Sequence, residues 1–241
     1  MSLLTLSGVA GGYGDVDIVT GINMHVDARE IVTIAGTNGA GKSTLIKAVM
    51  GYLPRLSGRI EFDGHDLRSL STEKRAGIGI SYVPQVRNIF STLTVLENLQ
   101  VVEKVADSRK RIAEMFDMFP ALASRRRTQA GNLSGGERQQ LAFARALMSS
   151  PRLILLDEPS AALSPALTEL VFAEVRKLPA TGAAVLMVEQ RARQALAFSD
   201  RGYILDSGKI VLTDTGSALL ANEKMAELYL GSKPVEPVQA S

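Results

Sequence analysis

The chain has no cysteine and only two histidines among its 241 residues, and this rules out several kinds of site at once. Without cysteine there is no disulfide framework, no thiolate zinc site and no cysteine nucleophile. Two histidines also argue against a polyhistidine metal site.

Long apolar runs and a strong net charge are absent as well. A membrane-spanning helix needs ~18–20 apolar residues, whereas the most apolar stretches, residues 153–156 and 183–188, have the length of strands. The N-terminus lacks the basic and then apolar pattern of a secretory signal. The formal net charge of +2 is too small to predict nucleic-acid binding. We therefore expect a soluble, cytoplasmic chain that reaches a membrane only through a partner.

The composition that remains is that of a folded protein, with 46% hydrophobic and 22% charged residues and a length that allows one or two domains. In the first third of the chain, short apolar runs separated by turn residues predict strands. These runs cover residues 3–9, 17–19, 22–26, 31–35, 59–62 and 78–83. The glycines at positions 11, 12 and 14 are expected to break the first run, and Asp63-Gly64 predicts a tight turn.

Residues 86–150 have a different pattern, which predicts a mostly helical insert. Thr94 and Glu97 have the spacing of a capping box at a helix start. Apolar residues at helical spacing then predict an amphipathic helix that Pro120 stops. These residues are Ile112, Met115, Phe116 and Phe119.

From residue 153 onward strands and helices alternate, which predicts parallel βαβ units with helices on both faces of a sheet. The expected strands are residues 153–156, 184–188, 202–206 and 210–213, and the expected helices are residues 165–178 and 192–198. Ser164 and Pro165 supply an N-cap and a first-turn proline. The buried stripe of the helix at 165–178 is expected to consist of Leu167, Leu170, Val171, Val175 and Leu178.

A glycine-rich loop follows the strand at 31–35 and fits the pattern G-x-x-x-x-G-K-[ST]. The loop and the residue after it are Gly36, Thr37, Asn38, Gly39, Ala40, Gly41, Lys42, Ser43 and Thr44. Glycines let successive backbone N–H groups curve around an anion, and the next helix presents its positive end. Lys42 would reach the β- and γ-phosphates, and the Ser43 hydroxyl would bind Mg²⁺. The alternative is a glycine-rich turn that binds nothing.

The apolar run at 153–156 leads directly into Asp157 and Glu158. Ligands bind at the carboxyl ends of the strands in parallel sheets. We expect Asp157 to hold Mg²⁺ and Glu158 to polarise the attacking water as a general base. Taken alone, the same residues could be a buried strand that ends in a solvated acidic turn.

The chain also contains the motif Leu133-Ser134-Gly135-Gly136-Glu137. Together with the loop at 36–44, the strand at 153–158 and Gln85, this motif makes the chain resemble the ATP-binding cassette (ABC) ATPase family. The resemblance extends from about residue 3 to residue 231. Ser134-Gly135-Gly136 is the specific motif, because other P-loop enzymes lack it. The resemblance implies an α/β fold: a P-loop NTPase (RecA-like) core with a parallel sheet, an N-terminal antiparallel β subdomain and an inserted α-helical subdomain. It implies one domain over residues 1–232 and a flexible tail at 233–241. It also implies ATP and Mg²⁺ as cofactors, and a head-to-tail dimer in which Ser134, Gly135 and Gly136 close on the γ-phosphate held by the other subunit.

The resemblance assigns further roles residue by residue. Tyr13 matches the aromatic residue that stacks on adenine. Gln85 matches the residue that senses Mg²⁺ and the γ-phosphate, and the helical insert matches the surface that docks a membrane permease. The candidates for that contact, which could equally be internal packing, are Asn88, Ile89, Phe90 and Leu93.

Two positions depart from the family's pattern. The family usually has aspartate where this chain has Ser164, so the N-cap is kept and a negative charge is lost. The family's switch histidine corresponds to Gln190, whose amide can donate a hydrogen bond to the γ-phosphate but cannot carry a positive charge. We therefore expect slow hydrolysis in the isolated subunit.

Within the family, the chain is similar to the second ATP-binding subunit of high-affinity branched-chain amino acid importers. The matching segments are Ser164-Pro165, Val188-Glu189-Gln190, Gln194-Ala195-Leu196, Asp200-Arg201-Gly202-Tyr203, Thr213-Asp214-Thr215-Gly216, Ala218-Leu219-Leu220-Ala221-Asn222 and Tyr229-Leu230-Gly231. The likeness implies membrane permeases, a second and different ATP-binding subunit, a periplasmic binding protein, and a place on the cytoplasmic face of the inner membrane. No nucleic-acid partner is expected, because the basic runs at 109–111 and 125–127 are short enough to be solvated faces. A subfamily that imports urea shares Glu189-Gln190, so the sequence does not decide between branched-chain amino acids and urea as the substrate. A soluble ABC ATPase without a role in transport is a remote alternative.

Overall fold

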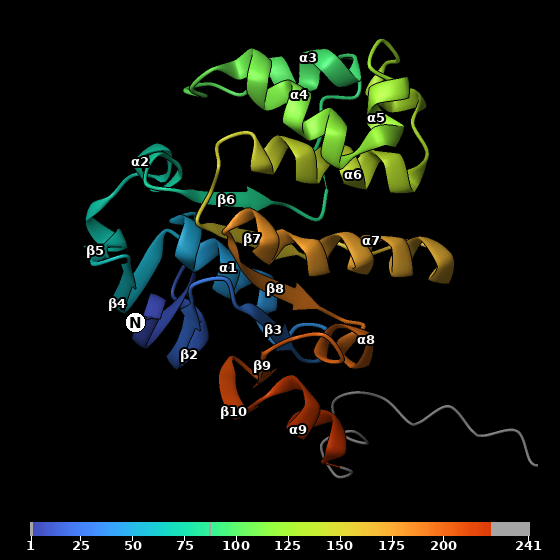
Figure 1. Ribbon diagram of the computed structural model, residues 1–241. Coiled ribbons are helices and arrows are strands. Elements are labelled where there is room, and N and C mark those ends of the chain that lie inside the picture. The colour runs from blue at the N-terminus through green and yellow to red at the C-terminus, as the bar shows by residue number, and fades with distance from the viewer. Residues whose placement is uncertain (1, 87, 223–241) are drawn as a thin grey trace, which may run out of the picture.

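The computed structural model describes residues 2–86 and 88–222, which form two β-sheets surrounded by helices (Figure 1). The predicted tail at 233–241 lies outside the described residues. So do residues 223–232, which the sequence assigns to the end of the domain.

The larger sheet contains six strands in the order β10-β9-β3-β8-β7-β6. Neighbouring strands are parallel except for β10, which pairs antiparallel with β9 at one edge. The strands are β3 (Ile31–Ala35), β6 (Ile80–Val83), β7 (Leu153–Asp157), β8 (Ala184–Glu189), β9 (Arg201–Asp206) and β10 (Lys209–Asp214). All residues of β3, β7 and β8 are buried, as expected for strands covered on both faces.

The smaller sheet is antiparallel and has the order β2-β1-β4-β5. Its strands are β1 (Ser2–Tyr13), β2 (Val16–Asp27), β4 (Arg55–Phe62) and β5 (His65–Asp66). Asp63 and Gly64 both have positive φ angles in the turn between β4 and β5, which is the predicted Asp-Gly turn. The two sheets together confirm the predicted α/β class with an N-terminal antiparallel subdomain.

Two predicted boundaries in this sheet are wrong. The first strand does not break at the glycines, because β1 continues to Tyr13, and the runs at 17–19 and 22–26 are parts of the single strand β2. A Cβ on Gly12 would lie 2.0 Å from the carbonyl oxygen of Val16 on the partner strand. Gly12 therefore permits β1 and β2 to approach each other closely inside a bulged hairpin. The sequence pattern predicts the end of a strand at this position.

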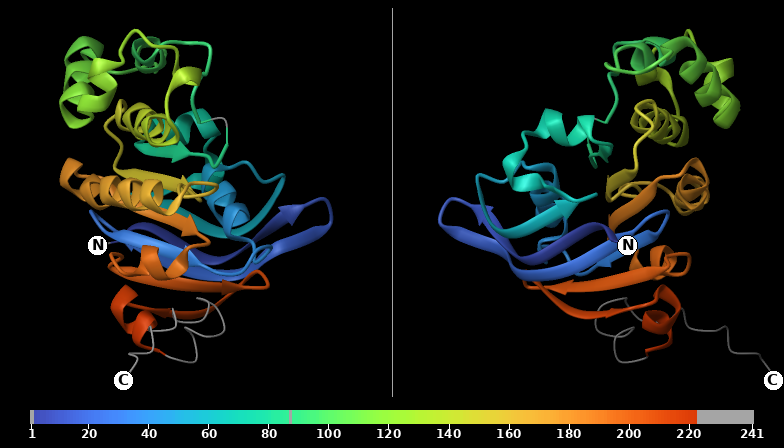
Figure 2. Two further views of the ribbon diagram at one scale, coloured as in Figure 1. Left: turned by 90° about the vertical axis from the view of Figure 1, so that its right-hand side faces the viewer. Right: turned by 60° about the vertical axis from the view of Figure 1, so that its left-hand side comes forward.

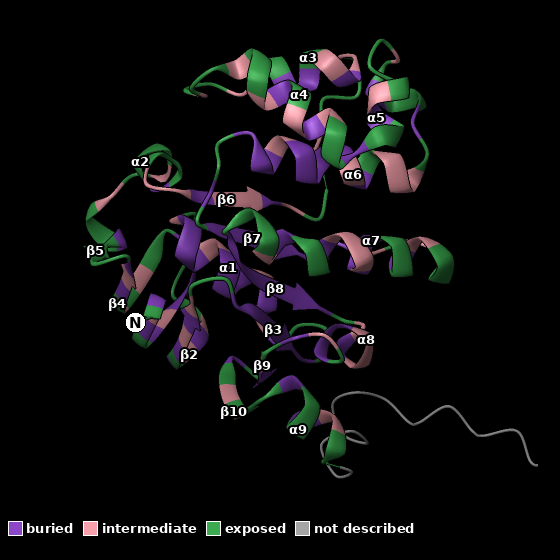
Figure 3. Ribbon diagram, in the orientation of Figure 1, coloured by how far each residue is buried: buried purple, intermediate pink, exposed green. Residues whose placement is uncertain are grey.

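Helices cover both faces of the larger sheet. Helix α1 (Lys42–Met50) lies between the two sheets and shares one apolar core with them. Helices α6 (Gly135–Leu147) and α7 (Pro165–Lys177) build a second core on the opposite face. Helices α8 (Ala192–Leu196) and α9 (Gly216–Ala221) pack around β9 in a smaller cluster. Figure 3 shows the buried residues concentrated on the central strands and on the inner sides of these helices.

Short helices together with α6 form a separate layer at one end of the molecule (Figures 1 and 2). They are α3 (Val95–Gln100), α4 (Ser108–Met118) and α5 (Pro120–Ser124). Thr94 and Glu97 form the predicted capping box at the start of α3. Pro120 stands at the first turn of α5, so it follows the end of one helix and starts the next. The remaining short helices are α2 (Thr72–Gly77) and the 3₁₀ turns at Leu67–Ser69, Ala130–Asn132 and Leu178–Thr181.

The inner face of α7 differs from the predicted stripe. Leu170 is 59% exposed, and the helix instead buries Thr168 and Phe172 together with Val171 and Val175. The Phe172 ring packs against the Phe198 ring at a centroid distance of 5.3 Å, which turns this side of α7 toward the sheet. Apolar spacing alone does not distinguish the centre of a buried face from its edge.

Candidate functional site

The glycine-rich loop runs from the end of β3 to the start of α1, as the sequence predicts. Gly36 is in close contact with β9, because a Cβ there would lie 2.2 Å from the carbonyl oxygen of Leu205. Gly39 and Gly41 have φ angles of +80° and +102°, which other residues adopt only with strain. The two glycines thus allow the loop to bend sharply, as a loop must do if its backbone N–H groups are to surround an anion.

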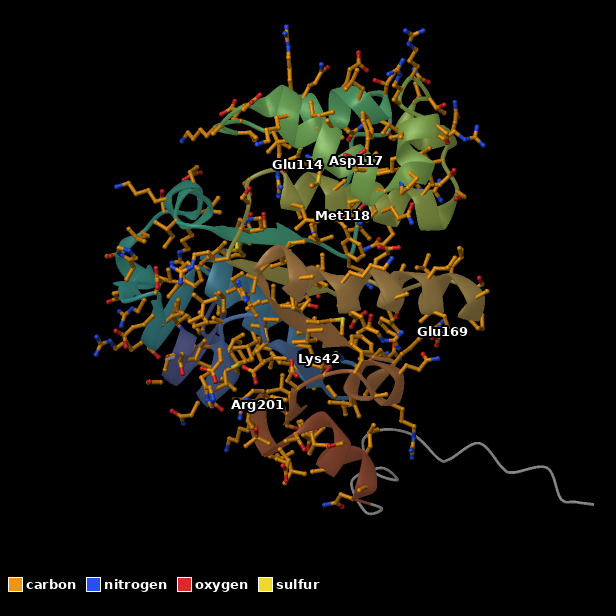
Figure 4. All side chains as sticks on the ribbon, in the orientation of Figure 1. Lys42, Glu114, Asp117, Met118, Glu169 and Arg201 are labelled. Carbon is orange, nitrogen blue, oxygen red and sulfur yellow. The ribbon has the colours of Figure 1, made fainter. Side chains whose placement is uncertain are left out.

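The Lys42 side chain is buried and folds back over this loop. Its Nζ donates to the carbonyl oxygens of Gly36 and Thr37 at 3.0 Å each, and lies 3.7 Å from a Glu158 carboxylate oxygen. In Figure 4, Lys42 lies in the region of the two sheets, away from Glu114, Asp117 and Met118 in the helical layer. The ammonium group is therefore held at the point where the loop and the end of β7 meet.

Polar side chains from three segments converge on the carboxyl end of β7. The Ser43 hydroxyl donates to Oδ1 of Asp157 at 2.7 Å. The Gln85 amide, just after β6, donates to Oε2 of Glu158 at 3.0 Å. The start of α1, residue 85 and the end of β7 are far apart in the sequence. They meet because β3, β6 and β7 are parallel strands of one sheet, whose carboxyl ends lie at one edge.

A cavity of about 270 Å³ lies in front of the loop. Its lining consists of Tyr13, Ile18, Asn38, Gly39, Gly41, Lys42, Ser43, Thr44 and Glu158. Tyr13, at the end of β1, is 45% exposed at this cavity. The structure therefore brings together the loop, the predicted base and the predicted adenine-stacking residue.

The donor set at this edge suits Mg²⁺ better than a metal that needs a complete protein cage. Among residues 2–86 and 88–222, no group of three or more histidine, cysteine, aspartate or glutamate residues could hold a metal ion. The available ligands are the Ser43 hydroxyl, the Asp157 carboxylate and the Gln85 amide. Mg²⁺ is typically bound through one or two carboxylates together with substrate phosphates and water, so a site with the single carboxylate of Asp157 and two neutral oxygen ligands fits it.

The Ser134-Gly135-Gly136 motif lies at the start of α6. Ser134 and Glu137 form a capping box, in which the Ser134 hydroxyl accepts from the Glu137 N–H and the Glu137 carboxylate accepts from the Ser134 N–H. Ser134 and Gly136 line a cavity of about 200 Å³ between α6 and α7. This cavity is separate from the one at the glycine-rich loop, so the fold of one chain places the two predicted phosphate-binding motifs apart.

Gln190 follows β8 and is exposed. Strand β8 pairs with β7, and the Glu158 N–H donates to the Val188 carbonyl oxygen at 3.0 Å. Gln190 therefore follows the strand next to the one that carries the predicted base. Ser164 caps α7 as predicted, with its hydroxyl accepting from the Leu167 N–H at 3.4 Å.

Sequence reasoning missed the role of Glu189. Its buried carboxylate accepts from the Ser160 N–H at 3.0 Å and from the Ser160 hydroxyl at 2.9 Å, and from the Gln190 N–H at 3.1 Å. Burial raises the pKa of this carboxyl group, against the opposing effect of the hydrogen bonds from Ser160. Glu189 thus ties the loop after β7 to the residue that follows β8.

Tyr82 on β6 was also missed. Its hydroxyl donates to Oδ2 of Asp157 at 3.1 Å. Burial, and then the nearby Asp157 charge, raise the pKa of this phenol well above its ordinary value. The only signal available in the sequence was its position three residues before Gln85, on a strand expected to belong to the sheet.

Comparison with known proteins places these features in a family. Residues 19–161 match the family described as ABC transporter. The chain is 41% identical to the high-affinity branched-chain amino acid transport ATP-binding protein BraG of Pseudomonas aeruginosa, over 95% of this chain and 100% of BraG. It is 38% identical to a probable branched-chain amino acid transport ATP-binding protein, LivF, of Archaeoglobus fulgidus, over 91% and 95% of the two chains. It is also 35% identical to the lipopolysaccharide export system ATP-binding protein LptB of Haemophilus influenzae, over 97% and 99%.

Solved structures agree with the fold. MJ1267, an ATP-binding cassette of an ABC transporter, superposes with a TM-score of 0.85 at 27% identity, over 94% of this chain and 98% of that one. The ATP-binding cassette MJ0796, a dimer in a post-hydrolysis state bound to ADP and Pi, superposes with a TM-score of 0.75 at 26% identity, over 88% and 98%.

Proposed function

Because the chain belongs to the ABC transporter family, as an ATP-binding subunit with ATPase activity, we propose that it powers the import of branched-chain amino acids through partner permeases. The observation that supports this substrate class is the full-length likeness to BraG, at 41% identity. Gln190, in place of the family's usual histidine, agrees with the same subfamily. We assign residues 1–232 to one nucleotide-binding domain with a helical insert at about 86–150.

The proposed reaction is hydrolysis of the ATP γ-phosphate by water. Tyr13 stacks on the adenine, and the loop from Gly36 to Thr44 holds the phosphates with its backbone N–H groups and Lys42. Glu158 accepts the proton of the attacking water, and Gln190 donates a hydrogen bond to the γ-phosphate. Lys42 and Gln190 thereby stabilise the charge that develops on the phosphate oxygens.

Mg²⁺ would be held by Ser43, Asp157 and Gln85, and would neutralise charge on the β- and γ-phosphates when bound. Gln85 also contacts the predicted base, since its amide donates to Glu158. One side chain therefore links the metal ligands to the group that activates water.

ABC ATP-binding subunits of this kind act as dimers and work with membrane permeases. We propose that the partner here is a related but different ATP-binding subunit, arranged head to tail, and that a periplasmic binding protein delivers the amino acid to the permeases. The separation of the Ser134-Gly135-Gly136 motif from the phosphate loop within one chain supports a site completed by a second subunit. This places the protein at the cytoplasmic face of the membrane by association. Among the described residues, no helix is both long and apolar enough to cross a bilayer.

The permease contact is proposed at the junction of the helical layer and the larger sheet, where a cavity of about 750 Å³ lies. Asn88 lines this cavity, and the half-exposed Phe90 ring carries the Arg145 guanidinium 4.5 Å from its centroid. Ile89, in contrast, packs against the core of the helical layer. Of the four predicted contact residues, Asn88 and Phe90 are thus the best placed to meet a partner.

A transport assay tests the proposed substrate class. The chain is co-expressed with the permease and binding-protein genes that neighbour it, and uptake of labelled leucine, isoleucine and valine is measured in membrane vesicles with ATP. We expect uptake to be lost in Lys42→Ala, which removes the ammonium group proposed to bind the phosphates; the thermal unfolding midpoint of this variant is measured alongside. Uptake of urea in place of the amino acids would contradict the substrate class, as would association with a lipopolysaccharide export complex. Failure to join any membrane fraction would contradict the transporter role.

A further inference from the structure

Tyr82 and Ser43 contact different oxygens of the Asp157 carboxylate. Within the paired strands β6 and β7, Tyr82 lies opposite Leu155, two residues before Asp157. Its hydroxyl donates to Oδ2 of Asp157 at 3.1 Å, while Oδ1 accepts from the Ser43 hydroxyl at 2.7 Å. Both carboxylate oxygens are therefore held by hydroxyl donors from different elements, which sets the rotation of the carboxylate about its Cβ–Cγ bond.

The Tyr82 ring is itself fixed by packing. It is partly buried, stacks at a tilt against Tyr52 with a centroid distance of 6.0 Å and an interplanar angle of 53°, and contributes to the wall of the cavity beside α6 with Ala142 and Arg145. A phenol on a strand, held by such packing, loses little further entropy when its hydroxyl forms a hydrogen bond. A hydrogen bond to a charged carboxylate is also stronger than one between neutral groups.

We propose that Tyr82 is a positioning residue for the metal site: its hydroxyl holds the Asp157 carboxylate in the rotation that Mg²⁺ binding with Ser43 requires. The inference rests on the proposed role of Asp157 as a Mg²⁺ ligand. Tyr82 acts through Asp157 and has no contact of its own with the reacting phosphate in this account. Hydrogen-bond partners of metal ligands commonly change metal affinity by about 10- to 100-fold when removed.

Tyr82→Phe removes the hydroxyl and leaves the ring in place. Tyr52→Phe is the matched control, because it removes the hydroxyl of the neighbouring ring. Among the described residues, the tyrosine hydroxyl that donates to Asp157 is that of Tyr82 and not that of Tyr52. Binding of a fluorescent ATP analogue is measured by titration in EDTA and again at increasing Mg²⁺ concentration. ATPase activity is measured over the same Mg²⁺ range, and the thermal unfolding midpoint is compared for both variants.

For Tyr82→Phe we expect the half-saturating Mg²⁺ concentration to rise by about tenfold, the lower end of the range for such partners, with nucleotide binding in EDTA unchanged. A merely structural role would instead weaken binding in EDTA and in Mg²⁺ alike. In an Asp157→Asn background the effect of Tyr82→Phe should largely disappear, since the two residues act as a unit. An unchanged Mg²⁺ requirement in Tyr82→Phe, or an effect that persists in full without the Asp157 carboxylate, would overturn the proposal.

A second pair of variants keeps the test decisive if Tyr82→Phe does not fold. Tyr82→Gln retains a hydrogen-bond donor and Tyr82→Met has none at a similar volume. We expect Tyr82→Met to bind Mg²⁺ more weakly than Tyr82→Gln. Equal Mg²⁺ binding by the two variants would contradict the proposed positioning role of the Tyr82 hydroxyl. If the proposed Mg²⁺ site itself is wrong, the unmodified protein would bind and hydrolyse ATP without any dependence on Mg²⁺. That result is distinct from a failure of the proposal for Tyr82, in which the unmodified protein depends on Mg²⁺ and Tyr82→Phe does not change that dependence.

Discussion

Gln190 is the residue at which this site departs most from the family's usual chemistry. It follows β8 and is exposed beside the segment that carries Glu158. A neutral amide can still donate to a phosphate oxygen, but it cannot provide the full positive charge of a protonated imidazole. The expected consequence is a slower chemical step with nearly normal nucleotide binding.

Substitution of Gln190 tests this role. We expect Gln190→Ala to lower the ATP turnover rate by about tenfold. This is less than the roughly 100- to 1000-fold loss that follows removal of a strong hydrogen-bond donor from a developing negative charge. The matched control is Gln194→Ala, the same change on α8, where the side chain donates to Glu169 at 3.2 Å. Steady-state phosphate release measures both. A turnover rate in Gln190→Ala equal to that of the unmodified protein would show that Gln190 does not contact the phosphate.

Residue identities predicted most of the site, and the exceptions have a common reason. Lys42, Ser43, Asp157 and Glu158 lie in motifs whose spacing indicates their chemistry, and the structure brings them together. Tyr82 and Glu189 belong to no local pattern, because their partners are 75 residues and 29 residues away. Their contacts depend on which strands become neighbours, which no short segment specifies.

At the scale of elements, α1 is anchored at both ends. Its first residues, Lys42 and Ser43, belong to the site. Its C-terminal end is capped by Arg75 of α2, whose buried guanidinium donates to the carbonyl oxygens of Ala48 and Val49 at 3.1 and 2.6 Å. Gly51, with a φ angle of +79°, makes room for it, since a Cβ there would lie 2.7 Å from the guanidinium carbon. Burial lowers the pKa of Arg75.

Loss of this cap should destabilise the fold. Arg75→Met leaves the Val49 carbonyl oxygen without its side-chain donor, whereas the Ala48 carbonyl oxygen keeps the Gly51 N–H. We therefore expect the free energy of unfolding to fall by about 2 kcal/mol, within the range for an unsatisfied buried group. Lys74→Met is the control, because Lys74 is exposed on the same helix and should change stability by less than about 0.5 kcal/mol. Urea denaturation followed by circular dichroism measures both; equal losses would contradict the capping role.

Element boundaries show where the sequence pattern was informative. The Thr94 capping box and the Ser164-Pro165 pair located the starts of α3 and α7, because these signals act within one turn of the helix. Val171, Val175 and Leu178 are buried as predicted, whereas the extent of the glycine-rich β1–β2 hairpin was predicted incorrectly, and so was the place of Leu170 on the inner face of α7. Both depend on what lies across from the element: a partner strand close to Gly12 in one case, and the Phe198 ring in the other.

At the scale of the whole molecule, the two proposed phosphate-binding motifs lie in different layers. The loop with Lys42 is next to the larger sheet, whereas Ser134 and Gly136 line a cavity between α6 and α7. A complete nucleotide site in our proposal therefore needs two chains, and ATP should act as part of the interface between them.

Removal of the proposed base tests this arrangement. Glu158→Gln should bind ATP without hydrolysing it, so we expect an ATP-dependent dimer in size-exclusion chromatography with multi-angle light scattering. If the physiological pair consists of two different subunits, the dimer forms when the second subunit is added. ADP should not support it, and Lys42→Ala combined with Glu158→Gln should stay monomeric. Hydrolysis at the normal rate by Glu158→Gln would show that another group is the base.

Local spacing in the sequence is enough to predict the strand–loop–helix of the proposed phosphate site, the acidic end of β7, the helical segment and the family, because these features depend on neighbouring residues of characteristic chemistry. The tertiary structure decided how β6, β7 and β8 stand side by side. That order places Gln85, Tyr82 and Glu189 around the two carboxylates, and it sets the Ser134 motif apart from the loop. Strand order is a long-range property, since it follows from burying the helices of both faces at once and cannot be inferred from any single segment.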